Sequence, residues 1–254
     1  MKYKWGIPSY KRAKAPLTVN LLNELGFTKE EIIVSTQTET DYEEYKKEQG
    51  ENATIIFRRG ENDSMNRNNV LGEFGEGQKV LLADDDIKAF CKLSADGKKL
   101  EKISSRYELE YFFDAMFAYC KKNNAKIWAW YPVENAFFMK HTIDDKNILC
   151  GTLFGIEKDR RFMFNDSYSL KGDFELSLRY IKSGYNAVRF NGFTCAARHK
   201  SSGGCSDARK NGENESRYQE LLRKYPELIK ASKRTGEIKY VGETKHTQES
   251  ELYG

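Results

Sequence analysis

The chain has 254 residues, and its 42 Lys and Arg residues against 38 Asp and Glu residues give a net charge of +4 at pH 7. This length suits one large domain or two small ones. A charge so close to balance means that any contact with nucleic acid depends on a local patch of cations. The longest apolar runs, at 80–83, 127–131 and 136–139, are far shorter than the ~20 residues that a membrane span requires, so we expect no membrane association.

The N-terminal sequence and the cysteines indicate where the protein resides. The opening MKYKWGIPSY lacks the apolar core of a secretion signal. The five cysteines include no C-x-x-C pair, which argues against a structural zinc site and against a disulfide framework. We therefore expect a cytoplasmic protein with reduced thiols.

Strand-like and helix-like segments alternate through the first half of the chain. We expect strands at 3–7, 31–36, 53–57 and 79–83, and helices at 16–25, from a capping box at Thr40 and Glu43, and at 63–71. Such alternation with short connections is typical of a parallel sheet covered by helices. Ligands of such sheets bind outside the carboxyl ends of the strands.

The second half of the chain is more mixed. Ser105 and Glu108 indicate the start of a helix with one apolar face, and Gly184 ends a second helix at 173–183. We expect strands at 127–131, 135–139, 149–156 and 187–194, a polar glycine-rich stretch at 198–212 and a helix at 215–225. The prediction is one α/β domain over 1–232, with a mostly parallel central sheet flanked by helices, and a loose polar tail over 233–254.

The strongest local signal is the run Asp84-Asp85-Asp86, directly after the apolar strand KVLLA. Three adjacent carboxylates repel one another, and a bound cation relieves that repulsion. Carboxylate oxygens suit Mg²⁺ or Mn²⁺, which often bridge to substrate phosphates. An isolated DDD run is more often a solvated turn, but its position at the end of a buried strand favours a ligand site.

Four other segments carry weaker signals. The polar helix start at 62–69 with Arg67, and the loop Pro8-Ser9-Tyr10-Lys11-Arg12, are able to bind phosphate or a base, although each is also explained as a capped helix or a basic turn. Asp173 and Glu175 begin a helix, where acidic residues are structurally favourable, and either is a candidate general base. His199 and Lys200 lie in a glycine-rich loop that suits a phosphate or a metal.

In this order, the segments resemble the GT-A glycosyltransferases over about 2–210 of the chain. The stretches GIPSYKRA, VLLADDDI, GDFELSLR and RHKSSGG more narrowly resemble the TET-associated glycosyltransferases of bacteriophages. That family is thought to attach sugars to oxidised pyrimidine bases, chiefly 5-hydroxymethylcytosine in DNA. The resemblance implies a UDP-sugar or similar donor, a DNA acceptor and, if a phage encodes the chain, the host cytoplasm as its location.

The resemblance also implies roles for individual residues. It implies that the metal ion, Mn²⁺ or Mg²⁺, is bound by Asp84, Asp86 and His199. It implies that the nucleotide-sugar is bound by Pro8, Ser9, Tyr10, Arg12, Ser35, Thr36, Arg67, Asp84, Asp85 and Lys200. Asp173 matches the last residue of the family's x-E-D base motif, which implies direct displacement with inversion. However, Gly172 precedes it where the motif has Glu, so Glu175 stays open as the base.

Two other classes of protein remain as alternatives. A sugar-phosphate nucleotidyltransferase uses a similar sheet and acidic strand end, but it usually carries a glycine-rich basic loop after the first strand. The segment GIPSYKRAK is poor in glycine. A non-catalytic nucleic-acid-binding module needs a stronger basic bias and gives no reason for the three aspartates. The combined pattern therefore favours the glycosyltransferase.

Overall fold

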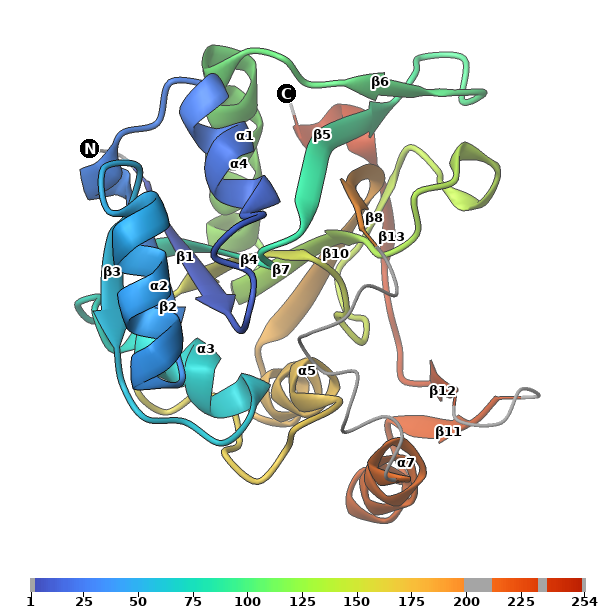
Figure 1. The fold of residues 1–254 in the computed structure, drawn as a ribbon. Coiled ribbons are helices and arrows are strands. Elements are labelled where there is room, and N and C mark those ends of the chain that lie inside the picture. The colour runs from blue at the N-terminus through green and yellow to red at the C-terminus, as the bar shows by residue number, and fades with distance from the viewer. Residues whose placement is uncertain (1–2, 199–211, 233–236, 253–254) are drawn as a thin grey trace.

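An eleven-stranded mixed sheet runs through the molecule, with helices on both faces (Figure 1). The computed structural model describes residues 3–198, 212–232 and 237–252. The strand order along the sheet is β13-β8-β10-β7-β9-β4-β1-β2-β3, and β5 and β6 branch from β10. The predicted α/β fold with a largely parallel central sheet is confirmed.

The first half of the chain builds a parallel block of four strands. These are β1 (Lys4–Ser9), β2 (Ile32–Thr36), β3 (Thr54–Phe57) and β4 (Lys79–Ala83), in the order β4-β1-β2-β3. They are connected through α1 (Leu17–Glu24), the short helix η1 (Lys29–Glu31), α2 (Glu39–Gln49) and α3 (Asp63–Leu71). Because the strands are parallel, their carboxyl ends meet at one edge of the sheet.

The second half extends this block with strands that run in both directions. It contains β5 (Ile87–Leu93), β6 (Leu100–Lys102), α4 (Arg106–Lys122), β7 (Ala125–Tyr131), η2 (Ala136–Phe138), β8 (Thr142–Asp144), β9 (Leu153–Glu157), α5 (Gly172–Lys182) and β10 (Asn186–Ala197). β9 pairs antiparallel with both β4 and β7. Consequently β7, and β10 parallel to it, run in the direction of β1–β4.

The C-terminal part forms a small separate sheet and adds a last strand to the main sheet. It comprises α7 (Glu213–Lys224), the antiparallel pair β11 (Ile229–Ala231) and β12 (Ile238–Tyr240), β13 (His246–Gln248) and η3 (Glu249–Leu252). β13 pairs with β8 at the edge of the main sheet. The expectation of a loose tail is therefore wrong for 237–252, while the domain division at residue 232 stays a prediction.

Two apolar layers enclose the sheet. The larger layer packs α1 and α4 on one face, with Trp5, Trp128 and Trp130 fully buried among phenylalanines. The second layer packs α3 and α5 on the other face, where Phe162 stacks on Tyr180 with ring centroids 4.0 Å apart. Burial of such large apolar side chains is a major favourable contribution to folding.

Two local predictions are wrong. The cap of α2 is Thr38, whose hydroxyl accepts from the amide of Asp41, so the predicted box at Thr40 and Glu43 lies inside the helix. The predicted strand at 135–139 is the 3₁₀ turn η2, begun by Asn135. Within the described ranges, no helix combines the length and the apolar character that crossing a membrane needs.

Candidate active site

The acidic turn 84–86 lies between β4 and β5, where helix α1 holds its backbone. The Thr18 hydroxyl donates to the carbonyl of Asp84 at 2.6 Å and accepts from the amide of Ile87 at 2.9 Å. The amide of Arg198, after β10, donates to the carbonyl of Asp86 at 3.1 Å. The turn is thus fixed from both sides, and the three carboxylates project in defined directions.

Asp85 points into the protein. Its carboxylate accepts from the Ser9 hydroxyl and from Arg12, and Arg12 also pairs with Asp86 at 3.0 Å. Burial raises the pKa of Asp85 to about 6, although Arg12 and Ser9 oppose the shift. The predicted residues Ser9, Arg12, Asp85 and Asp86 therefore come together in one charged group, in which Asp85 positions Arg12.

Asp84 binds the buried guanidinium of Arg67. Arg67 on α3 donates to Asp84 at 2.7 Å and to Asp63 at 2.6 Å, and its plane lies over the rings of Phe154 and Phe164. Its Nη1 atom is buried and has no partner among the described residues. Burial, with the charges of Asp63 and Asp86, raises the pKa of Asp84 to about 7 in spite of Arg67. This edge of the sheet thus has more carboxylate groups than Arg12 and Arg67 can neutralise.

Asp173 lies in the first turn of α5 and belongs to the same electrostatic group. Its carboxylate accepts from the amide of Phe174 at 2.9 Å. Burial raises the pKa of Asp173 to about 6, with Arg67 opposing the shift and Asp63 adding to it. The structure also explains the glycine that precedes it. A Cβ atom at Gly172 would collide with the Ser64 hydroxyl of α3 as it is placed here, so a side chain at this position requires that hydroxyl to move.

Glu175 is engaged elsewhere. Its side chain is 1% exposed, accepts from Lys224 at 2.8 Å and from Tyr225 at 3.1 Å, and pairs with Arg179 at 3.0 Å. These contacts join α5 to α7. The structure therefore does not bring Glu175 to the acidic turn with Asp173.

The ends of β1 and β2 form the remaining part of the predicted nucleotide site. In the parallel register Pro8 lies beside Ser35, and Ser9 beside Thr36. Tyr10 follows at the strand end, with the Lys11 ammonium 4.8 Å from its ring centre. Asn66 of α3, which the sequence analysis did not select, donates to the carbonyls of Ser9 and Ser35 at 3.1 and 3.2 Å.

Asn66 leaves an acceptor at this place that the protein does not use. Because both backbone carbonyls fix the amide orientation, its Oδ1 atom is the acceptor, and it has no partner among the described residues. The buried Ser35 hydroxyl likewise has no partner within the described part of the chain. Buried polar groups are rarely left unpaired, so these two atoms suit the polar edge of a ligand.

A metal ion was also predicted here. No three His, Cys, Asp or Glu side chains of the described residues form a metal-binding group, and the predicted His199 and Lys200 lie outside those residues. The chemistry of the available donors nevertheless fits a hard divalent cation. Asp84 and Asp86 are only partly buried, and Asp84 carries a raised pKa that a neighbouring cation would reverse.

Comparison with known proteins identifies the fold. No family model and no curated protein matches the chain. Its fold is similar to that of the mannosyltransferase PcManGT from Pyrobaculum calidifontis, solved with GDP-Man and Mn²⁺, at a TM-score of 0.57 and 13% identity, covering 89% of this chain and 64% of that one. It is also similar to GalNAc-T7, solved with UDP, GalNAc and Mn²⁺, at a TM-score of 0.54 and 10% identity, covering 89% and 52%.

These likenesses define the class of fold. The chain has the α/β fold of the GT-A-type glycosyltransferases. It spans less than two thirds of the length of either of those two chains. At these identities the likeness shows the fold alone, and the activity has to be argued from the site.

Proposed function

We propose that this chain is a metal-dependent glycosyltransferase that moves a sugar from a nucleoside-diphosphate-sugar to a hydroxyl group. The observation that supports this most directly is the arrangement around Arg67. Carboxylates from the turn after β4 and from the start of α5 gather around one buried guanidinium, and both Asp84 and Asp173 have a raised pKa. Perturbed carboxyl groups at the strand ends of an α/β sheet are typical of an active site.

We assign the donor nucleotide to the ends of β1 and β2. The unpartnered Ser35 hydroxyl and Asn66 Oδ1 are suited to the edge of a base, and Tyr10 offers an aromatic face. Arg67 and Arg12 supply positive charge toward the phosphates. UDP is the proposed nucleotide, in keeping with the UDP bound by GalNAc-T7.

Asp84 and Asp86 would hold Mn²⁺ or Mg²⁺, with His199 as a further proposed ligand and Lys200 as a proposed phosphate contact. When bound, such an ion neutralises the charge of the leaving diphosphate. Arg12 limits the freedom of Asp86, because it pairs with Asp85 and Asp86 together. We therefore propose that Asp85 acts through Arg12 to orient Asp86.

We assign the role of general base to Asp173. Its pKa of about 6 leaves it mostly ionised near neutral pH, yet basic enough to accept a proton from a hydroxyl. As the hydroxyl loses its proton to Asp173, its oxygen forms the new bond to the anomeric carbon, and the bond to the diphosphate breaks. A single displacement of this kind inverts the configuration. Glu175 is the less favoured candidate, because its oxygens are already used by Lys224, Tyr225 and Arg179.

For the acceptor, we propose 5-hydroxymethylcytosine in DNA. Support comes from the likeness of four sequence segments to the TET-associated glycosyltransferases. The hydroxymethyl group must leave the base stack, or be presented unpaired, to reach the donor.

The test is mass spectrometry of hydroxymethylated and unmodified DNA after incubation with a panel of nucleotide-sugars and Mn²⁺. We expect a mass increase of one sugar on the modified DNA alone. Asp86→Ala should abolish it, whereas Asp96→Ala, which changes an exposed carboxylate in the loop between β5 and β6, should not. No sugar transfer with any donor, together with no binding of any nucleotide in the presence of Mn²⁺, would contradict the proposal.

A further inference from the structure

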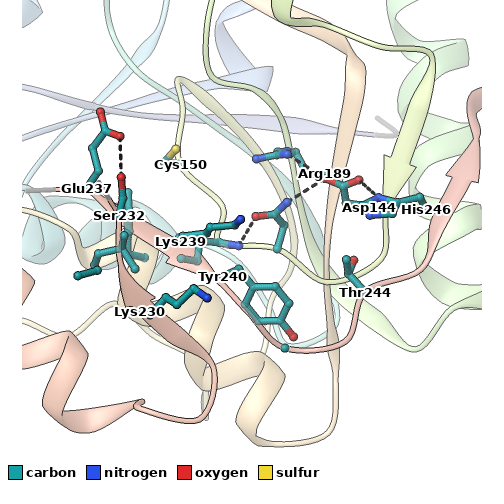
Figure 2. Close-up of a pocket in the computed structure, with 16 residues that line it drawn as sticks. Asp144, Cys150, Arg189, Lys230, Ser232, Glu237, Lys239, Tyr240, Thr244 and His246 are labelled. Atoms are coloured by element: carbon teal, nitrogen blue, oxygen red, sulfur yellow. Dashed lines mark hydrogen bonds and ion pairs between the residues drawn. The ribbon is translucent and has the colours of Figure 1, made fainter. Parts of the chain in front are cut away.

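A pocket of about 970 Å³ lies beside the proposed active site, between the main sheet and the pair β11–β12 (Figure 2). Its walls come from β8 and β10 on one side, from β11 and β12 on the other, and from Cys150 and the start of α5 between them. Ligand pockets typically have volumes of about 300–1,000 Å³. This one is therefore large enough for a substantial ligand.

The pocket adjoins Asp173. Phe174, the residue after Asp173, lines it together with Cys150. Burial and the nearby Asp173 carboxylate raise the pKa of Cys150 to about 12. Lys171 interacts electrostatically with Asp173, with Cys150 and with Glu237 on the opposite wall. The pocket and the proposed base thus belong to one neighbourhood.

The basic side chains of the pocket are of two kinds. Arg189 pairs with Asp144 at 2.8 Å, and the His246 ring contacts the same carboxylate at 2.7 Å. Lys230 and Lys239, by contrast, are exposed and pair with no carboxylate among the described residues. They are direct cross-strand neighbours in the β11–β12 register. Like charges placed opposite each other on paired strands are unfavourable, and a bound anion reverses that effect.

Two partly exposed aromatic side chains line the pocket as well. Tyr240 follows Lys239 on β12 (Figure 2). Phe174 of α5 also lines the pocket. Cations beside aromatic faces are the combination by which proteins hold unpaired nucleic-acid strands, with phosphates on the cations and bases or sugars on the rings. Among the described residues that line the pocket, the carboxylates are those of Asp144 and Glu237.

We infer that this pocket is the acceptor site, and that it takes a nucleotide of an unpaired DNA strand with its phosphates against Lys230 and Lys239. The inference rests on the proposed function for its link to sugar transfer, because Asp173 adjoins the pocket. Binding of the DNA strand in the pocket does not depend on whether the chain transfers sugar.

The experiment measures binding of a labelled single-stranded oligonucleotide with one 5-hydroxymethylcytosine by fluorescence anisotropy over a range of salt concentrations. Each phosphate contact to a single strand contributes about 0.7 to the slope of log K against log salt. The double variant Lys230→Ala/Lys239→Ala should therefore have a slope shallower by about 1.4. The control Lys47→Ala/Lys98→Ala removes two exposed lysines on α2 and in the β5–β6 loop, and should leave the slope unchanged.

A second variant tests the aromatic wall. Tyr240→Ala should weaken binding roughly 5- to 150-fold through lost stacking, while Tyr240→Phe should bind like the wild type. Circular dichroism melting of each variant confirms that it is folded. In the sugar-transfer assay, the lysine double variant should raise KM for the oligonucleotide and leave kcat and the Mn²⁺-dependent binding of UDP unchanged.

The outcomes separate the two proposals. If both lysine pairs give the same slope, the pocket assignment fails whether or not the chain transfers sugar. If wild type binds no nucleotide-sugar but the lysine variant alone loses oligonucleotide binding, the pocket assignment holds and the proposed function fails. If heparin fragments bind in a Lys230- and Lys239-dependent way and the oligonucleotide does not, the occupant is an anionic glycan and the inference is overturned.

Discussion

Arg67 lies between two carboxylates that come from different elements, Asp63 on α3 and Asp84 after β4. It is 8% exposed, and its Nη1 atom has no partner among the described residues. Each carboxylate near it would otherwise be a poorly compensated charge in a partly buried place. Removal of one member of a buried ion pair is more damaging than the net strength of the pair suggests.

For this reason, Arg67→Ala should lower the free energy of unfolding by about 3–5 kcal/mol at neutral pH. Urea unfolding followed by circular dichroism measures this loss. Addition of Mn²⁺ should restore part of it, because a cation at Asp84 replaces some of the lost positive charge. Arg58→Ala is the matched control, since the Arg58–Glu73 pair is largely exposed and should contribute less than about 1 kcal/mol. An equal loss in both variants would contradict the role given to Arg67.

Three carboxyl groups at the site predict a pH dependence of stability. The ordinary pKa of Asp is 3.8, and burial raises the pKa of Asp84 to about 7 and those of Asp85 and Asp173 to about 6. Between these values the native state holds protons that the unfolded chain has released. The free energy of unfolding should therefore fall as pH rises from about 4 to about 7.

Asp173→Asn tests one part of that slope. Between about pH 4 and 7, Asp173 should lower the free energy of unfolding of the wild type by on the order of 2–3 kcal/mol. The variant should lack this contribution. Urea titrations at several pH values compare the two chains. Asp144 and Glu31 have a lowered pKa, so each stabilises the folded protein in its ionised form. That stabilisation is lost only on acidification to lower pH. Parallel curves for wild type and variant between pH 4 and 7 would contradict the expectation.

At the scale of elements, α5 carries two acidic residues with different surroundings. Asp173 and Glu175 are two positions apart, which places them about 200° apart around a helix. Asp173 therefore lies toward Arg67 and α3, whereas Glu175 contacts Lys224 and Tyr225 of the α7 segment. Residue type and spacing alone do not decide which of the two is free, because the answer depends on what α7 covers.

This difference predicts opposite phenotypes for two similar substitutions. Glu175→Gln should lower the melting temperature, because Lys224 and Arg179 lose their charged partner. It should leave turnover per folded molecule nearly unchanged. Asp173→Asn should reduce turnover about 10²–10⁴-fold and keep nucleotide binding. Sugar-transfer rates and nucleotide-dependent melting shifts, measured on both variants, would assign the base to Glu175 if the pattern were reversed.

Local signals predicted some elements of the fold with the observed limits. The helix Asp63–Leu71 and the strand Lys79–Ala83 have the bounds expected from their cap and their apolar run. The strand β5, directly after the acidic turn, was not predicted. Segment 135–139 is apolar enough for a strand, but Phe137 is 85% exposed in a turn. Composition alone does not tell a buried strand from an exposed aromatic turn.

The sequence predicted where part of the candidate site would lie, but not its contacts. Asp84, Asp85 and Asp86 directly follow an apolar strand, and such strand ends are where ligands of α/β sheets bind. The sequence does not reveal that Asp85 turns inward to Ser9 and Arg12, or that Asn66 presents an unused acceptor beside Ser35. Those features depend on tertiary partners tens of residues away in the chain.

At the scale of the whole molecule, the C-terminal residues decide which strand forms the edge of the sheet beside β8. β13 covers β8, the amide of Glu249 donates to the carbonyl of His141 at 3.0 Å, and Leu252 packs in the larger apolar core. The sequence of this part is polar, which is why it was predicted to be loose. Its few pairing and anchoring residues hold it in place through contacts with distant strands.

Truncation after residue 232, the predicted domain boundary, tests this arrangement. The shortened chain loses β12, β13 and η3, so β8 becomes an open edge and a buried leucine is missing from the core. We expect the melting temperature to fall by more than about 5 °C, since a loss of 1 kcal/mol corresponds to about 2–4 °C at this size. We also expect aggregation through the open edge, measured by light scattering. A chain ending at Leu252 is the control. Equal melting temperatures and a monodisperse truncated chain would instead support a domain that ends at residue 232.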